Sequence, residues 1–218
     1  MNIIEAFNFD FNHNLSSYLC KQVLTATAAF HILLKENSDF FSYPEFSSVK
    51  GTLLNYSIER SLYDAAFSAD ASYKAYQQKV NNFNRSILHL ETEHFRVTAA
   101  KTMKWNTLPY ASNYKRNYAA ANSGCSGQLS FDFVTQSVSQ EPYYAILTYG
   151  YNSLAQECNH IDLLLPDENF ANFIYRKDLL SLQTSVSAVP SASEGEETLA
   201  KLKPEFEAQI VNLKANER

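Results

Sequence analysis

Three stretches in the first half of the chain repeat apolar residues at the three-to-four-residue spacing of an α-helix. They cover residues 14–36, 46–67 and 71–106. Asn14 and Asp70 precede two of these stretches and are of the residue types that cap helix N-termini. Because each predicted helix has one apolar face, we expect the three helices to pack against one another as a bundle.

The pattern changes after Gly124, where apolar and polar residues begin to alternate with a period of two. We expect strands over residues 128–135, 143–151 and 160–165, joined in sequence order as an antiparallel sheet. A short helix is expected after Asp167. A run of helices followed by a run of strands predicts the fold class α+β, with an N-terminal bundle of three helices and a small antiparallel three-stranded sheet.

The composition changes again near the C-terminus. Residues 183–197 are small, polar and acidic, which is typical of a flexible linker that follows an α+β body over residues 1–182. A last helix is expected over residues 198–218, with the apolar stripe Leu199, Leu202, Phe206, Ile210 and Leu213. This stripe must be buried, either on the body of the same chain or on a second copy, so a homo-oligomer through residues 198–218 is one alternative.

Hydrophobic residues make up 45% of the chain, enough for a substantial core. The three cysteines, Cys20, Cys125 and Cys158, are widely spaced and odd in number, which argues against a disulfide framework or a zinc site. No apolar stretch has the length of a membrane span, and the N-terminus lacks the pattern of a signal peptide. We therefore expect a cytoplasmic protein with free thiols and no membrane partner. Its richness in Asn and Ser fits a low-GC bacterial or phage gene.

The charges are unevenly distributed. Between Lys74 and Arg116 there are eight cations and two anions, whereas the rest of the chain holds ten cations and twenty-one anions. Most of the cations fall on the polar side of the predicted helix 71–106, and those after it alternate with tyrosines, a pattern that suits phosphate contacts and base stacking. The candidate nucleic-acid or anion-binding residues are Lys74, Arg85, His89, Arg96, Lys104, Lys115 and Arg116. The alternative is the solvated face that every amphipathic helix has.

Three polar residues, Glu91, His94 and Lys101, fall on or beside the apolar side of the same predicted helix. Buried charges must be paired, so these side chains form either a polar network between packed helices or a pocket with catalytic or metal-binding chemistry.

The Glu-x-x-His spacing occurs at Glu91/His94 and again at Glu157/His160. The two further helical glutamates that a di-metal centre requires are not evident, and there is no glycine-rich phosphate loop, so we expect no metal and no cofactor.

These observations predict a non-catalytic interaction or regulatory protein that acts through contacts with a protein partner or with itself. The aromatic residues of the predicted loops are of the types that interfaces favour. One alternative is a nucleic-acid-binding protein that uses the basic stripe. Another is an enzyme with a pocket around Glu91, His94 and Lys101.

Overall fold

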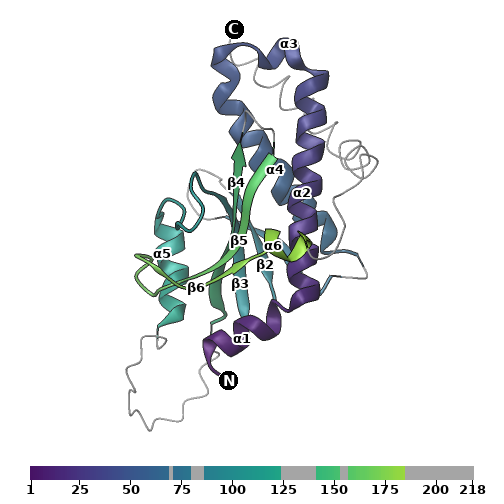
Figure 1. The fold of residues 1–218 in the computed structure, drawn as a ribbon. Helices are drawn as coiled ribbons and strands as arrows, with labels where there is room; N and C mark the ends of the chain where they lie inside the picture. Colours follow the sequence, from purple (N-terminus) through teal and green to yellow (C-terminus); the bar gives the residue numbers. More distant parts are fainter. Residues whose placement is uncertain (69–70, 80–85, 124–140, 153–156, 185–218) are drawn as a thin grey trace.

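The computed structural model describes residues 1–68, 71–79, 86–123, 141–152 and 157–184. Within them a single six-stranded mixed sheet is flanked by helices on both faces (Figure 1). The helices are α1 (Ile3–Asp10), α2 (His13–Glu36), α3 (Ser38–Phe41), α4 (Ser47–Ala65), α5 (Asn113–Ala119) and α6 (Leu180–Thr184), with short 3₁₀ turns η1 (Pro44–Phe46) and η2 (Ala120–Asn122). The strands are β1 (Lys74–Lys79), β2 (Ser86–Glu91), β3 (Phe95–Lys101), β4 (Tyr143–Asn152), β5 (Glu157–Pro166) and β6 (Phe173–Asp178).

The strands lie in the sheet in sequence order, β1 to β6. Neighbouring strands are antiparallel within β1–β3 and within β4–β6. The two halves meet at the parallel pair β3–β4, in register from Phe95 opposite Tyr143 to Lys101 opposite Tyr149. A parallel pair cannot be closed by a hairpin, so the chain crosses the sheet between these strands, and it carries α5 and η2 on the way.

The long helices α2 and α4 pack against each other and cover one face of the sheet, whereas α5 lies on the other face (Figure 1). Both helices extend past the ends of the strands, where α3 and η1 join them. Asn12 caps α2, because its side-chain oxygen accepts a hydrogen bond from the Leu15 N–H at 3.1 Å. The main core lies between this helical layer and the sheet, and a smaller cluster under α5 contains Ala119, Tyr144, Ile146 and Phe170.

The protein is α+β, but the expected three-helix bundle with a small three-stranded sheet is wrong. The segment predicted as a helix over 71–106 forms the strands β1, β2 and β3. Its apolar residues fit a helical spacing, but Phe95, Val97 and Ala99 also alternate with period two, and they face the α2–α4 layer. The residues expected as a short helix after Asp167 form a turn and the edge strand β6.

Two expected helices and two expected strands are present in the structure, and two expected elements lie outside the described residues. The helices expected over 14–36 and 46–67 correspond to α2 and α4, and the strands expected over 143–151 and 160–165 correspond to β4 and β5. The strand expected over 128–135 and the C-terminal segment 198–218 lie outside the described residues. None of the helices in the described ranges combines the length and apolar character that a membrane crossing needs.

Asn122 joins the crossover to the sheet. Its fully buried side-chain amide donates to the carbonyls of Tyr144 (2.9 Å) and Pro166 (2.8 Å), and its oxygen accepts from the Tyr144 N–H at 2.8 Å. Pro166 has no N–H with which to bond the neighbouring strand β4. The Asn122 side chain takes over hydrogen bonding to the backbone of both strands at this end of the β4–β5 pair.

We predict that Asn122→Ala lowers the free energy of unfolding by about 3–5 kcal/mol, because three backbone groups lose their partners in a buried environment. Urea denaturation followed by circular dichroism measures this change. Asn117→Ala on the exposed side of α5 is the matched control and should leave stability nearly unchanged. Equal stabilities of the two variants would contradict the role given to Asn122.

Candidate functional site

A cavity of about 940 Å³ opens where α2 and α4 extend past the sheet. Its walls come from α2, α3 and α4, and its base comes from the ends of the parallel strands β3 and β4. The lining residues are Phe30, His31, Ile32, Leu34, Lys35, Ser38, Phe41, Ser42, Lys50, Gly51, Leu54, Lys101 and Tyr151. We refer to this cavity as the α2–α4 pocket.

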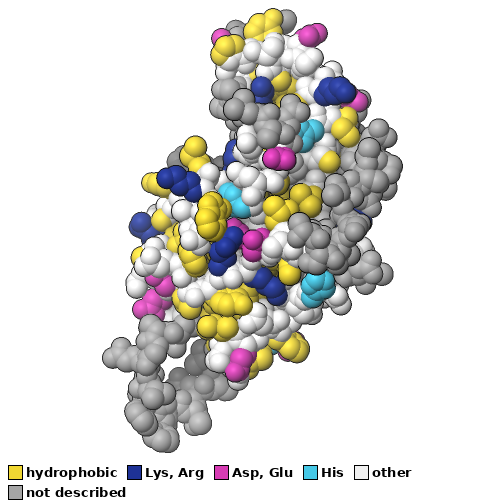
Figure 2. All heavy atoms as spheres, in the orientation of Figure 1, with side chains coloured by type: hydrophobic (Ala, Val, Ile, Leu, Met, Phe, Trp, Pro, Cys, Tyr) yellow, Lys and Arg dark blue, Asp and Glu magenta, His cyan; other side chains and the backbone are white. Residues whose placement is uncertain are grey.

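The inner part of the α2–α4 pocket is apolar. Phe30, Phe41 and Leu54 are almost completely buried and belong to the main core, so their positions are fixed by packing on the sheet. Figure 2 shows yellow apolar atoms next to Lys or Arg and His side chains in the part of the molecule formed by the outer ends of α2 and α4. The pocket therefore offers a rigid apolar surface beside polar groups.

Three lysines line the pocket: Lys35 in the last turn of α2, Lys50 in α4, and Lys101 at the end of β3. No Asp or Glu is among the described lining residues, and within the described part of the chain none of the three lysines forms an ion pair. The Lys101 ammonium lies 5.9 Å from the centre of the Tyr151 ring, a cation–π distance. The described lining of the pocket thus carries three positive charges and no negative charge.

His31 and Tyr151 add hydrogen-bonding groups to the pocket. The His31 Nε2 atom lies 3.3 Å from the Tyr151 hydroxyl, and the two ring centres are 5.4 Å apart. Burial raises the pKa of Tyr151 to about 12, so the phenol keeps its proton at neutral pH and can donate a hydrogen bond.

Gly51 leaves part of the pocket open. A Cβ atom built at Gly51 has no heavy atom within 4 Å, so the space in front of α4 at this point is empty. Glycine costs a helix about 1 kcal/mol relative to alanine, and here it widens the pocket.

The structure separates the three residues of the predicted catalytic pocket. Glu91 ends β2 and its side chain lies on the α5 side of the sheet, whereas Lys101 lies on the other face and lines the α2–α4 pocket. His94 lies in the turn between β2 and β3, where its Nδ1 is 2.8 Å from the Asp10 carboxylate. Residues that share one face of a helix point to opposite faces of a sheet when the segment forms strands, because side chains alternate with period two along a strand.

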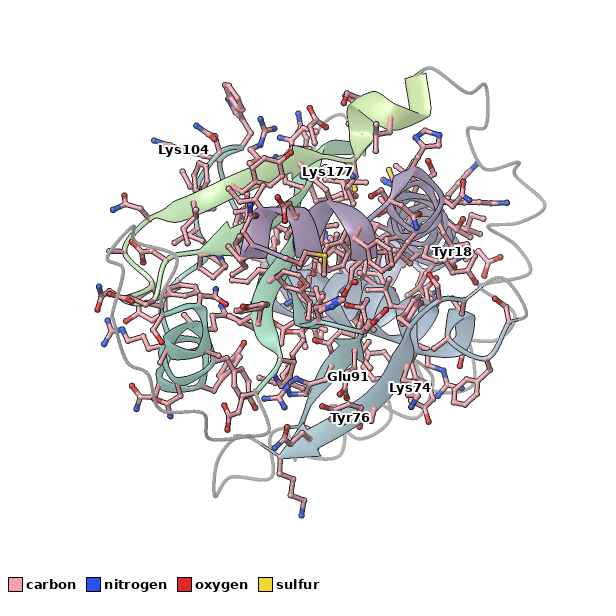
Figure 3. All side chains as sticks on the ribbon, turned by 90° about the horizontal axis from the view of Figure 1, so that it is seen from below. Tyr18, Lys74, Tyr76, Glu91, Lys104 and Lys177 are labelled. Carbon is pink, nitrogen blue, oxygen red and sulfur yellow. The ribbon has the colours of Figure 1, made fainter. Side chains whose placement is uncertain are left out.

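The predicted basic stripe is also divided, because it was placed on one helix and that helix does not form. Figure 3 shows Lys74 beside Tyr76 and Glu91, with Lys104 on the opposite side of the molecule. The Lys115 ammonium donates to the Tyr110 carbonyl at 3.0 Å, and Arg116 lies on the exposed side of α5. Arg85 lies outside the described residues.

His89 and Arg96 lie on the α5 face of the sheet. The Arg96 guanidinium is 4.9 Å from the centre of the Tyr118 ring. His89 is completely buried, stacks on Tyr76 and has no hydrogen-bond partner for either ring nitrogen within the described part of the chain. Its burial rules out direct contact with phosphate in this structure.

A buried polar cluster on the α5 face was missed by the sequence reasoning. Thr102 Oγ1 lies 2.7 Å from His160 Nε2, and the Arg176 Nε–H donates to Oδ1 of Asp162 at 3.0 Å, while Nη2 of Arg176 forms an ion pair with the same oxygen at 2.8 Å. A Cβ at Gly150 would come within 2.3 Å of the His160 ring, so the imidazole packs directly on the backbone there. His160 and Asp162 alternate with Ile161 and Leu163, the signal that places them together on one face.

Burial shifts the titration of this cluster in opposite directions. It lowers the pKa of His160 and raises the pKa of Asp162, although the hydrogen bond and the charge of Arg176 act against the second shift. All the members except Arg176 are nearly inaccessible, and the second carboxylate oxygen of Asp162 has no hydrogen-bond partner in the described chain. The cluster links the residue after β3 to β5, and β5 to β6, and it is enclosed, whereas the α2–α4 pocket is open to solvent.

Comparison with protein-family models, with curated proteins and with solved structures found no match to this chain.

We predict that His89 makes the protein less stable in acid. Burial, and secondarily the Arg96 charge, lowers the pKa of His89 from 6.5 to about 4. The unfolded state therefore binds a proton more readily than the folded state, and stability present above pH 6.5 is lost as the pH falls towards 4. The maximum loss is about 3 kcal/mol.

His89→Phe keeps the ring stacking with Tyr76 and removes the titrating group. It should reduce the acid-dependent loss of unfolding free energy by this amount and raise stability at neutral pH, because it removes two buried nitrogens that have no partner in the described chain. Urea unfolding across this pH range is the measurement. An acid dependence identical to that of the wild type would contradict the prediction.

Proposed function

We propose that the protein is a non-catalytic binding protein whose ligand is an organic anion with an apolar part, held in the α2–α4 pocket. The observation that carries the proposal is the convergence of Lys35, Lys50 and Lys101 on a cavity with an apolar inner wall and no described carboxylate. The apolar wall accounts for the apolar part of the ligand, and the lysines account for its charge.

Electrostatics favour an anionic ligand over a neutral one. Three ammonium groups around one cavity repel one another, and the attraction of a bound anion to each of them offsets this repulsion. Hydrogen bonds from an ammonium to a carboxylate, phosphate or sulfonate oxygen are shorter and stronger than neutral ones. The Tyr151 phenol adds a neutral donor beside Lys101.

The size and position of the pocket support the same proposal. A volume of about 940 Å³ lies at the upper end of the range of small-molecule sites, which is about 300–1,000 Å³. Lys101 and Tyr151 lie at the carboxyl ends of the parallel strands β3 and β4, the edge where ligands bind in open sheets with parallel strands.

The first test uses anilinonaphthalene sulfonate, an aromatic anion, and its uncharged analogue N-phenylnaphthylamine. We expect fluorescence titration to show saturable binding of both, with higher affinity for the anion. Replacing Lys35, Lys50 and Lys101 with Met keeps the aliphatic stems but removes the charges. This variant should lose about tenfold or more in affinity for the sulfonate, equivalent to at least about 1.4 kcal/mol, and bind the neutral probe as before.

Two further variants make the result specific. Gly51→Leu should weaken binding of both probes, because its side chain enters the empty part of the pocket without a clash at Cβ. Lys104→Met removes a lysine on another surface and is the matched control. Equal sulfonate affinity in the wild type and the triple Met variant, with an unchanged melting temperature, would show that the pocket does not bind anions.

A second candidate function, contact with another protein chain, is favoured by the loop between β3 and α5. Met103, Trp105 and Tyr110 are exposed by 94%, 63% and 91%, an unusual concentration of large apolar side chains in one loop. The Trp105 ring lies over the Arg176 guanidinium at 5.3 Å, which orients it, and Trp, Tyr, Met and Arg are enriched in protein interfaces.

Trp105 is the only tryptophan in the chain and therefore reports burial of this loop directly. If a second copy is the partner, tryptophan emission should shift to shorter wavelength as protein concentration rises, in parallel with the mass from sedimentation velocity. Changing Met103, Trp105 and Tyr110 to Ser should keep the mass at that of the monomer. A constant mass and emission maximum in the wild type would contradict self-association through this loop.

A further inference from the structure

The turn between β2 and β3 brings a histidine and two carboxylates together. The ligand atoms of Asp10, Glu93 and His94 all lie within 4.8 Å of one another. Asp10 comes from the end of α1, more than eighty residues earlier in the chain, so the cluster exists only because α1 packs beside this turn. It lies apart from the α2–α4 pocket, since the two share no residue.

Asp10 holds the turn in one conformation. Its carboxylate side chain is only 1% exposed and has hydrogen bonds from Thr92 Oγ1 (2.6 Å) and the His94 N–H (2.8 Å) on one oxygen. The other oxygen lies 2.8 Å from His94 Nδ1. A carboxylate oxygen accepts, so Nδ1 must carry a proton and donate it. The imidazole is therefore fixed in both orientation and tautomer.

This arrangement directs the other ring nitrogen outward. In the neutral ring Nε2 then has the lone pair, and His94 is 27% exposed, so the lone pair can be reached from solvent. A histidine that binds a metal ion usually donates its other N–H to a carboxylate, which orients the ring and makes the ligating nitrogen more basic. Asp10 and His94 have this relationship.

Glu93 supplies a second ligand on the exposed side. Its Oε1 atom lies 3.9 Å from His94 Nε2. Two ligand atoms of a tetrahedral zinc ion are about 3.4 Å apart, with bonds of about 2.0–2.2 Å, so a small movement of Glu93 completes the geometry. The Glu93 side chain is 69% exposed, and its rotation disturbs no packing.

We propose that Glu93 Oε1 and His94 Nε2 bind a divalent transition-metal ion, with Asp10 as the outer-shell carboxylate. Water fills the remaining coordination positions, because the site is open to solvent. A mixed imidazole and carboxylate set suits zinc, cobalt, nickel or copper rather than magnesium or calcium, which prefer all-oxygen sites.

A protonated His94 that merely bridges two carboxylates is the competing explanation of the same geometry. The two explanations differ in what Nε2 binds, a metal ion or a proton. Nitrogen-15 NMR of the histidine side chains distinguishes them, because coordination shifts the resonance of the ligating nitrogen. On addition of Zn²⁺ to the full chain, we expect the shift at Nε2 of His94 while Nδ1 keeps its proton.

Calorimetric titration with Zn²⁺ and with Mg²⁺ measures affinity and selectivity. We expect one Zn²⁺ site, no comparable Mg²⁺ site, loss of binding in His94→Gln and a fall of about tenfold or more in Glu93→Gln. Asp10→Asn should weaken binding by about 10–100-fold, the usual effect of losing an outer-shell partner. If Asp10→Asn does not fold, Glu93→Gln still decides, because that side chain is exposed.

His13→Ala is the matched control, since His13 is an exposed histidine at the start of α2. It should bind Zn²⁺ as the wild type does. Absence of Zn²⁺ binding, a shift confined to another histidine, or equal affinity in the wild type and Glu93→Gln would each overturn the proposal.

Discussion

The parallel pairing of β3 with β4 is the constraint on which the rest of this structure depends. Parallel neighbours need a long crossover, and the crossover places α5 on the face of the sheet that α2 and α4 leave open. The same pairing makes both strands end at one edge, which brings Lys101 and Tyr151 together under the projecting ends of α2 and α4. The Asn122 amide, hydrogen-bonded to Tyr144 and Pro166, holds the crossover in place.

The two faces of the sheet have different chemistry. The face under α2 and α4 is covered by apolar side chains and contributes most of the core. The face that carries α5 buries polar groups as well, including His89, Thr98, Thr148, His160 and Asp162. Buried polar groups are stabilising only where hydrogen bonds compensate their loss of water, as for Thr98 with the Tyr144 hydroxyl at 2.7 Å. His89 lacks this compensation, because neither of its ring nitrogens has a partner in the described chain, and its lowered pKa makes it an acid-sensitive point of the fold.

The binding sites that we propose lie at the periphery of the structure, and the packed core lies at its centre. The α2–α4 pocket, the β3–α5 loop and the Asp10–His94 turn lie at ends or edges of the sheet. The polar cluster around His160 and Asp162 contains the strongest alternatives for acid–base chemistry, but its side chains are enclosed by neighbouring strands. This difference in accessibility is the reason why we propose a binding role rather than a catalytic one.

The sequence by itself determined those elements in which the spacing of apolar residues fits either a helix or a strand, but not both. α2 and α4 are long enough for a helical period to be distinct, and Ile161, Leu163 and Leu165 alternate too regularly for a helix. Over 71–106, by contrast, the apolar positions fit both periods, and only pairing within the six-stranded sheet selects strands. The sequence groups Lys101 with Glu91 and His94, whereas in the structure it lines a pocket with Lys35 and Lys50. Nothing in the sequence distinguishes Lys35 and Lys50 from other lysines, because they come together only when α2, α4 and β3 pack. Only the tertiary structure determined the candidate sites, because their side chains come from distant parts of the sequence and can act on one ligand only after packing brings them together.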